Sequence, residues 1–243
     1  MKKIYVIGLG PGGLNEVTPR AMEALEESDV IIGYTVYVDL IRSKFEHKKL
    51  LTTAMTKEVD RCKMVFEEAM KDQVVSIVCS GDSGVYGMSG LMYELSQGYE
   101  AVDIEIISGI TAACSGAAVL GAPLIHDFVV ISLSDLLTPM ELIEKRLECA
   151  AIGDFAMSIY NPSSKKRHDY LEKACKIILQ HRDPKTPAGW VRNIGRDGQE
   201  YKVMTLEELQ YEKLDMFTTV FIGNSQSKII NNKIVTPRGY RNV

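Results

Sequence analysis

The feature that most constrains the fold of this chain is a regular alternation of apolar runs with amphipathic segments. The apolar runs predict β-strands, several of them continuous enough to be buried on both faces, at 4–7, 30–32, 74–79, 104–107, 129–133, 155–159, 190–191 and 219–222. Apolar residues at helical spacing lie between them, at 57–71, 139–149 and 165–181. This alternation predicts an α/β fold with mostly parallel strands. The turn-rich segment 184–198 predicts antiparallel pairs in the last third.

The length allows one large domain or two of about 120 residues each. The segment Gly121-Ala122-Pro123-Leu124 interrupts the pattern near the middle of the 243 residues. We therefore expect an N-terminal α/β domain at 1–121 and a C-terminal α/β domain at 122–243.

Composition limits the partners that we expect. A net charge of −4 and a pI near 5.7 give no overall attraction to phosphate backbones, so no nucleic-acid partner is expected. No apolar stretch approaches the roughly 18 to 20 residues of a membrane-spanning helix, so no membrane partner is expected either. The five cysteines are widely spaced and include no C-x-x-C pair, which argues against a disulfide framework or a protein-held metal and favours a cytoplasmic location.

A glycine loop, "IGLGPGGLNEVT", follows the first apolar run and places Gly8, Gly10 and Gly13 in a G-x-G-x-x-G pattern. In dinucleotide-binding folds the third glycine lies in the first turn of a helix that receives the pyrophosphate. A nicotinamide-dependent oxidoreductase is therefore one hypothesis for this loop. A tight turn without a ligand is another.

Three details of the same loop argue against a dinucleotide. Thr18 is a good N-cap and Pro19 a good first helical residue, so we expect the helix to begin well after Gly13. Pro11 lacks one N–H that a phosphate would use. No carboxylate ends the second predicted strand, where Gly33 and Tyr34 stand.

Two further loops rich in small residues follow predicted strands, and open α/β sheets bind ligands at such strand ends. In "CSGDSGVYGMSG" (79–90) Asp82 offers a carboxylate that disfavours a phosphate and favours a ligand with a cationic part. The alternative is that Asp82 caps a helix over 85–96. In "ISGITAACSGAA" (107–118) Thr111 can cap a helix of very small residues.

The order GLGPGG, GDSGVYG, SGITAA and IYNP resembles the tetrapyrrole methylases, which use S-adenosylmethionine to methylate corrin and sirohaem precursors. The longer stretches "GYTVYVDLI", "GDSGVYGMSGL", "GAPLIHDFVVISLSDLLTP", "YNPSSKKR" and "TPRGY" are similar to the C17-methyltransferases of cobalamin synthesis, which act on precorrin-3B or its cobalt counterpart. The resemblance covers essentially the whole chain.

The resemblance implies two αβα domains with S-adenosylmethionine in the cleft between them. It assigns the methyl-donor contacts to Pro11, Ser80, Gly81, Asp82, Val85, Tyr86, Thr111, Ala112, Tyr160, Asn161 and Ala188. It also implies a homodimer. Any cobalt would arrive within the tetrapyrrole substrate, because the sequence shows no metal-binding cluster.

Ring contraction, which the resemblance adds to methyl transfer, requires proton transfer. Candidates for this catalytic work are Tyr34, Ser132 and Asp135. Candidates for substrate binding are Gly10, His126, Ser134, Lys165, Lys166 and Arg167. The three cations open a predicted helix at the end that disfavours positive charge, which indicates an anionic ligand or else a solvated helix face. His126 is alternatively a structural histidine.

Other functions stay open at this point. One is methyl transfer to another position of a corrin or sirohaem precursor. The others are the nicotinamide-dependent oxidoreductase and a non-catalytic dimeric binding protein.

Overall fold

The computed structural model describes residues 2–164 and 168–240 and divides the chain into two compact units, one ending at Ala112 and one beginning at Ala113. The expected boundary lay nine residues later, after Gly121. Helix α6 (Ala112–Leu120) joins the second unit because Gly116 packs on Phe221, whose ring lies 2.7 Å from where a Cβ would be. The side chain of Lys233 also donates a hydrogen bond to the carbonyl of Val119, at 2.7 Å.

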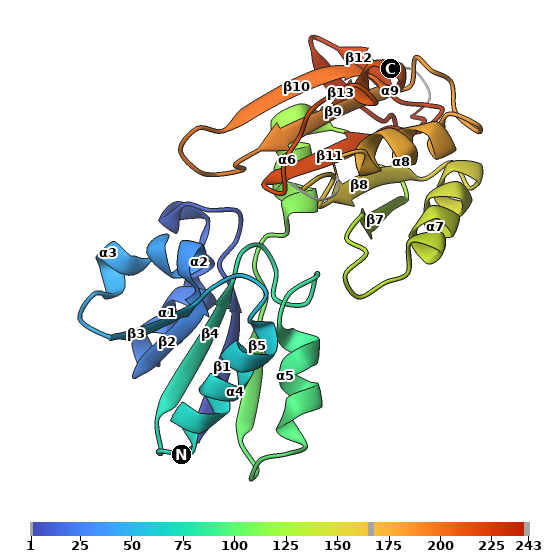
Figure 1. Cartoon of the computed structure of the whole chain (residues 1–243). Helices are drawn as coiled ribbons and strands as arrows, with labels where there is room; N and C mark the ends of the chain where they lie inside the picture. Colours follow the sequence, from blue (N-terminus) through green and yellow to red (C-terminus); the bar gives the residue numbers. More distant parts are fainter. Residues whose placement is uncertain (1, 165–167, 241–243) are drawn as a thin grey trace. The chain divides into compact units, whose positions relative to one another are not determined.

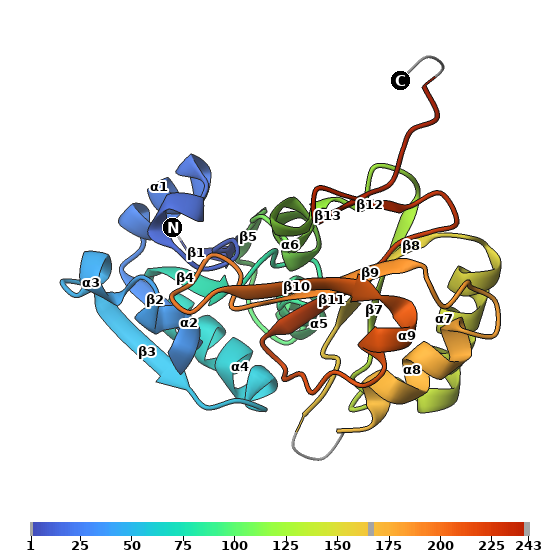
Figure 2. The same ribbon diagram turned by 90° about the horizontal axis from the view of Figure 1, so that it is seen from above.

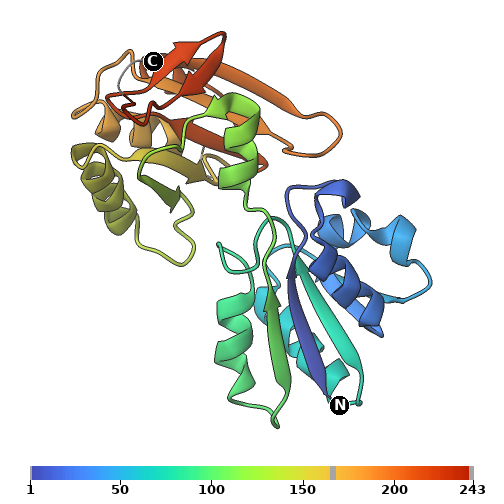
Figure 3. The same cartoon turned by 180° about the vertical axis from the view of Figure 1, so that it is seen from behind.

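The first unit is built on a parallel five-stranded sheet in the order β3-β2-β4-β1-β5. Its strands are β1 (Lys3–Gly8), β2 (Val30–Tyr34), β3 (Lys49–Thr53), β4 (Val74–Cys79) and β5 (Asp103–Ile107). Figure 3 shows β1, β4 and β5 running side by side. The predicted strands of this half are confirmed, and β3 is the one that the apolar pattern missed.

Helices cover both faces of this sheet (Figure 1). Alternate residues of β1 face opposite ways: Tyr5 and Ile7 pack with α1 (Pro19–Glu27), α2 (Thr35–Asp39) and α3 (Arg42–Phe45), whereas Ile4 and Val6 pack with α4 (Glu58–Ala69) and α5 (Ser89–Ser96). Burial on both faces explains why these strands are continuous apolar runs.

The start of α1 is where the sequence placed it. Thr18 is the N-cap, and its hydroxyl accepts a hydrogen bond from the N–H of Ala21 at 3.2 Å. Pro19 is the first helical residue, where a missing N–H costs nothing. Between Gly13 and Thr18 the chain forms only a short 3-10 turn, Leu14–Glu16.

The second unit contains a mixed sheet in the order β10-β9-β11-β8-β7. Its strands are β7 (Phe128–Ser132), β8 (Ala156–Tyr160), β9 (Pro187–Arg192), β10 (Glu200–Thr205) and β11 (Thr218–Ile222). Strands β7 and β8 are parallel, and the pairs among β8, β11, β9 and β10 are antiparallel, which confirms the expectation for the last third. Figure 2 shows β9, β10 and β11 lying side by side.

One face of this sheet packs against α7 (Met140–Ile152), α8 (Tyr170–Ile178) and α9 (Leu206–Leu209) around a single apolar core. The other face packs against α6 and β13, since both Leu120 and Ile234 approach the backbone of Gly189. Strand β13 (Lys233–Val235) forms a small sheet with β12 (Lys228–Ile230) and with β6 (Gly121–Ala122).

Within the described ranges, no helix has the length and apolar character needed to cross a membrane. Cys62, Cys79 and Cys175 are buried, where they pack as small apolar side chains, and Cys114 and Cys149 are exposed.

Candidate functional site

Three glycine-containing loops meet at one edge of the first sheet. Because β1, β4 and β5 are parallel neighbours, the loops that follow them leave the sheet at the same edge. A Cβ on Gly109 would lie 2.3 Å from the carbonyl oxygen of Gly81 and 2.5 Å from that of Gly8. Only glycine permits this approach of backbone on backbone. The glycines therefore set the shape of the edge where α/β sheets bind ligands.

The N–H groups of Leu9 and Gly10, which open the first loop, already bind other backbone, as does that of Gly81 in the second loop. The N–H of Leu9 donates to the carbonyl of Cys79 at 2.8 Å, and Gly10 and Gly81 exchange two hydrogen bonds of 3.0 and 2.7 Å. A pyrophosphate would need such groups free, at the start of a helix. Here they bind other backbone, and α1 begins only at Pro19. The geometry is that of a braced loop, not of a dinucleotide cradle.

The Asp82 carboxylate braces two of these loops. It accepts hydrogen bonds from the N–H of Gly84 at 2.7 Å and from the N–H of Gly109 at 3.0 Å. The suggested helix over 85–96 is shorter, because α5 begins at Ser89 with Met88 as its N-cap, so Asp82 does not cap it. The carboxylate thus links the β4 and β5 loops and keeps a negative charge at the sheet edge.

The other candidates of the first unit lie on the same edge. Gly10 and Pro11 belong to the first loop, Ser80, Gly81, Val85 and Tyr86 to the second, and Thr111 and Ala112 to the third, where α6 starts. Tyr86 has a φ of 55° and is 58% exposed, an unusual conformation for a large residue that the loop holds open to solvent. Tyr34 ends β2 and lies at this edge one strand further on, with its ring edge-on to Tyr37 at 5.1 Å.

Candidates of the second unit gather where β7 and β8 end. Ser132 is paired with Tyr160 in the parallel register. The Ser132 hydroxyl accepts hydrogen bonds from the side-chain amide of Asn161 at 2.9 Å and from the N–H of Ser134 at 3.2 Å. The hydroxyl of Tyr160 accepts a hydrogen bond from the N–H of Ala113, at the start of α6, at 2.7 Å. Asn161 has a φ of 53°, which asparagine tolerates better than most residues.

Asp135 follows Ser134 in the chain, and its carboxylate accepts a hydrogen bond from the hydroxyl of Tyr170 at 2.8 Å. Two other assignments, His126 and Ala188, are not part of this group at the ends of β7 and β8. His126 is exposed and precedes the amino end of β7, roughly 20 Å of extended chain from Ser132. Ala188 is fully buried in β9, between β10 and β11. Lys165, Lys166 and Arg167 lie outside the described residues.

Sequence reasoning missed several residues that hold these loops. The buried hydroxyl of Ser83 lies 3.2 Å from the carbonyl oxygen of Val6 and 3.4 Å from that of Ile107, so it ties the β4 loop to β1 and β5. Arg61 of α4 contacts the end of β3 and Met88. Ser83 lies within the quoted stretch GDSGVYG, but the sequence does not show that its hydroxyl is buried between two strands, and Arg61 on an amphipathic helix belongs to no motif.

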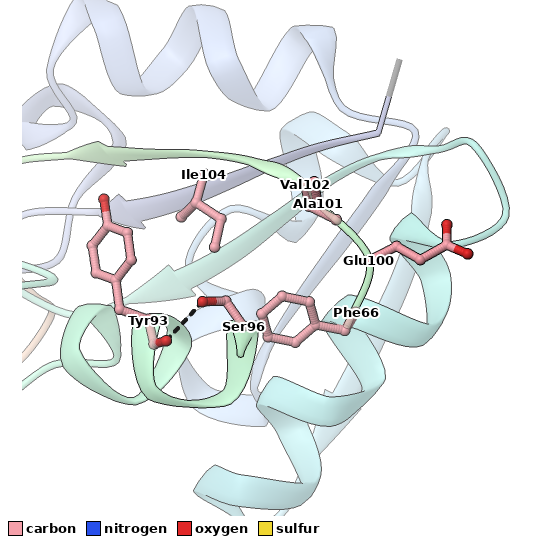
Figure 4. Close-up of a pocket in the computed structure, with 7 residues that line it drawn as sticks. All are labelled: Phe66, Tyr93, Ser96, Glu100, Ala101, Val102 and Ile104. Atoms are coloured by element: carbon pink, nitrogen blue, oxygen red, sulfur yellow. Dashed lines mark hydrogen bonds between the residues drawn. The ribbon is translucent and has the colours of Figure 1, made fainter. Parts of the chain in front are cut away.

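A shallow pocket of about 210 Å³ lies at the opposite edge of the first sheet (Figure 4). Its lining comes from α4, α5, the connection into β5 and the start of β5: Phe66, Tyr93, Ser96, Glu100, Ala101, Val102 and Ile104. It contains none of the candidate residues, and the hydroxyl of Ser96 donates to the carbonyl of Tyr93 at 2.7 Å. Among the described residues no three His, Cys, Asp or Glu side chains are placed to hold a metal ion.

Two α/β units with glycine loops at a sheet edge define a class of fold, and comparison with known proteins identifies the family. The family model of the Tetrapyrrole (Corrin/Porphyrin) Methylases matches residues 3–210. The chain therefore belongs to the tetrapyrrole methylase family.

Similar proteins support this membership over the whole length. A "probable cobalt-factor III C(17)-methyltransferase" of Methanocaldococcus jannaschii is 44% identical over 246 residues, 98% of this chain and 97% of the relative. The crystal structure of the methyltransferase CobJ is similar with a TM-score of 0.90 and 36% identity, covering 97% of this chain and 99% of that one. The chain spans only about half of two longer relatives, 45% of one and 53% of the other.

A uroporphyrin-III C-methyltransferase from Thermus thermophilus, solved in complex with S-adenosylhomocysteine, has a TM-score of 0.71, covering 91% of this chain and 92% of that one. At 18% identity this likeness shows the fold alone.

Proposed function

We propose that the chain is an S-adenosylmethionine-dependent C-methyltransferase that methylates C17 of a corrin precursor, precorrin-3B or its cobalt counterpart, with ring contraction, in cobalamin biosynthesis. The observation that carries this proposal is the match over nearly the whole chain, at 44% identity, to a relative named as a probable cobalt-factor III C(17)-methyltransferase. The proposal includes a cytoplasmic homodimer.

The sheet edge of the first unit suits the proposed donor. S-adenosylmethionine supplies a methyl group on a cationic sulfur, and the thioether that leaves is neutral. The loops of this edge carry the Asp82 carboxylate. The N–H groups of Leu9, Gly10 and Gly81 donate hydrogen bonds to backbone carbonyls, which agrees with a ligand that lacks phosphate. We assign donor contacts there to Pro11, Ser80, Gly81, Asp82, Val85, Tyr86, Thr111 and Ala112, and in the second unit to Tyr160, Asn161 and Ala188.

The chain's main contribution to methyl transfer is positioning, because holding two reactants in line supplies an effective molarity on the order of 10⁵ M or more. We call the edge of the first sheet where the three glycine loops lie the donor edge. The close backbone contacts among Gly8, Gly81 and Gly109 restrict movement of this edge. A rigid edge lowers the entropy lost when the donor is oriented.

For the proton transfers of ring contraction, we assign Tyr34, Ser132 and Asp135. Tyr34 stands at the donor edge of the first unit. The other two lie at the end of β7 and just after it in the second unit, where the hydroxyl of Tyr170 donates to Asp135 and the side-chain amide of Asn161 donates to Ser132. Fixed side chains of this kind are what proton transfer at a defined atom requires.

The test uses S-adenosylmethionine with a labelled methyl group and the C20-methylated precursor, with and without cobalt, in parallel incubations. We expect one label per macrocycle, located at C17 by mass spectrometry and NMR. Label at another ring position would identify a different methyltransferase of the family. Absence of label, together with calorimetric binding of NAD but not of S-adenosylhomocysteine, would replace the proposal by the oxidoreductase hypothesis.

A further inference from the structure

Arg61 is a buried cation at the edge of the first sheet where the glycine loops lie. It is 5% exposed and extends from α4 toward the end of β3. Its Nε donates to the Thr53 hydroxyl at 2.8 Å and one terminal nitrogen donates to the carbonyl of Ala54 at 3.1 Å. The other terminal nitrogen lies 3.9 Å from the sulfur of Met88, the residue that precedes α5. The guanidinium thus joins the β3 and β4 loops.

Within residues 2–164 and 168–240, no carboxylate lies at ion-pair distance from this guanidinium. Asp60, on the same helix, pairs with Lys57, and Glu68 pairs with Lys49 and Lys71. Arg182, which is also buried, does pair with a carboxylate, that of Asp154. A buried charge without a counter-ion is unfavourable because its lost hydration is repaid only by neutral acceptors.

The weakest partner of Arg61 is the Met88 thioether. A thioether sulfur is a poor acceptor, and methionine has a flexible side chain that readily repacks. Met88 is half-buried, and its sulfur is in contact with the guanidinium. A stronger acceptor could therefore replace the sulfur without breaking the bonds to Thr53 and Ala54.

Ser89 gives a second, independent observation, next in the chain to the residue whose sulfur contacts Arg61. It directly follows Met88 as the first residue of α5, is 8% exposed, and its hydroxyl has no hydrogen-bond partner. Its backbone N–H is used, donating to the carbonyl of Ser83 at 3.0 Å. Buried hydroxyls are rarely left unpaired, and a helix start favours an anion.

We propose that Arg61 and Ser89 bind a carboxylate of a ligand at this sheet edge, with Met88 moving aside. The inference rests on the proposed function, in which the methyl donor and the tetrapyrrole both carry carboxylates. Arginine suits this role because its planar fork binds a carboxylate with two hydrogen bonds, which the compact ammonium of lysine does not match.

The experiment compares the wild type with Arg61→Lys and Ser89→Ala, and with Arg42→Met as a control at an exposed arginine of α3. The probes are S-adenosylhomocysteine, its decarboxylated analogue and uroporphyrin. If the donor supplies the carboxylate, Arg61→Lys loses about tenfold in affinity for S-adenosylhomocysteine and nothing for the analogue. If the tetrapyrrole supplies it, affinity for S-adenosylhomocysteine is unchanged and that for uroporphyrin falls by about tenfold.

Ser89→Ala removes no hydrogen bond seen in the structure, so its melting temperature should equal that of the wild type. Its affinity should fall for the same probe whose binding Arg61→Lys weakens. If Arg61→Lys does not fold, the affinities of Ser89→Ala test the proposed carboxylate site. Unchanged affinities for all probes, or equal losses for S-adenosylhomocysteine and its analogue, would make Arg61 a purely structural tie and overturn the inference.

A wild-type protein that binds neither S-adenosylhomocysteine nor uroporphyrin would refute the proposed function. In that case acetate, exchanged for chloride at constant ionic strength, tests the site by itself. Acetate should raise the melting temperature of the wild type but not that of Arg61→Lys. Equal responses would overturn the inference independently of the function.

Discussion

The carboxylate of Asp82 accepts a hydrogen bond from the backbone N–H of Gly109, 27 residues further along the chain, at 3.0 Å. Its other oxygen accepts from the N–H of Gly84 at 2.7 Å. One side chain therefore fixes two of the three loops at the proposed donor edge. Both bonds are charge-assisted, which makes them stronger than neutral ones.

Replacing Asp82 by Asn should loosen this edge. An amide offers one acceptor oxygen in place of two, so one backbone N–H loses its partner and the charge is gone. We expect a loss of about 1–3 kcal/mol in the free energy of unfolding, and weaker S-adenosylhomocysteine binding by about tenfold. Chemical denaturation and calorimetry measure the two effects. Asp103→Asn, at the amino end of β5, is the control and should change binding little; equal effects of the two variants would contradict the role of Asp82.

Adding one methyl group at Gly109 should be severely destabilising. The new Cβ would lie 2.3 Å from a carbonyl oxygen of Gly81, so backbone and not a flexible side chain must move. We expect Gly109→Ala to cost about 3 kcal/mol or more, seen as a lower melting temperature or loss of folded protein. Gly90→Ala is the matched control, since nothing lies within 4 Å of its Cβ in the first turn of α5. This control should stabilise by roughly 0.5–1 kcal/mol, and similar outcomes for both glycines would refute the crowding argument.

Acid should remove a stabilising contribution of Glu68. The ammonium groups of Lys49 and Lys71 donate to its carboxylate at 2.7 and 2.9 Å and lower its pKa below the ordinary value of 4.5. A pKa lowered by folding means that the contribution to stability is complete above pH 4.5 and disappears as the pH falls through the lower, folded-state value.

Both ammonium groups are largely exposed, so we expect Glu68→Gln to lower the free energy of unfolding by about 1 kcal/mol at pH 7 and by less near pH 3. Urea unfolding at both pH values measures this, with exposed Glu67→Gln as the control; a difference independent of pH would show that packing, not charge, matters at Glu68.

The sequence indicates that the loops after β1, β4 and β5 lie at one edge of the sheet, because parallel strands bring the loops that follow them to the same side. The capping signal of Thr18 and Pro19 placed the start of α1 correctly, and this start distinguishes the loop from a dinucleotide cradle. The strands buried on both faces were also predicted, because burial on both faces leaves a continuous apolar run in the sequence.

What the sequence did not predict depends on partners far along the chain. The partner of Asp82 is a backbone group 27 residues away, and β6 pairs with β13, whose Ile234 lies opposite Gly121. The unit to which α6 belongs is decided by the ring of Phe221. His126 and Ser132 are close in sequence but lie at opposite ends of β7, because an extended strand separates residues that a helix would keep together.

In the second unit, the hydroxyl of Tyr160 should hold the start of α6. It accepts a hydrogen bond of 2.7 Å from the N–H of Ala113, a fully buried residue, whereas the Tyr160 carbonyl separately receives the N–H of Leu133 at 2.9 Å. Tyr160→Phe therefore removes the first bond and keeps the second. The N–H left without an acceptor should cost about 1–3 kcal/mol in the free energy of unfolding.

Because Thr111 and Ala112 are proposed donor contacts at this helix start, S-adenosylhomocysteine should also bind less tightly to Tyr160→Phe, with the donor KM raised more than kcat is lowered. Tyr211→Phe, at a tyrosine that is 74% exposed, is the control. A variant as stable as the wild type, with unchanged donor affinity, would show that water replaces the hydroxyl and that Tyr160 does not position the helix.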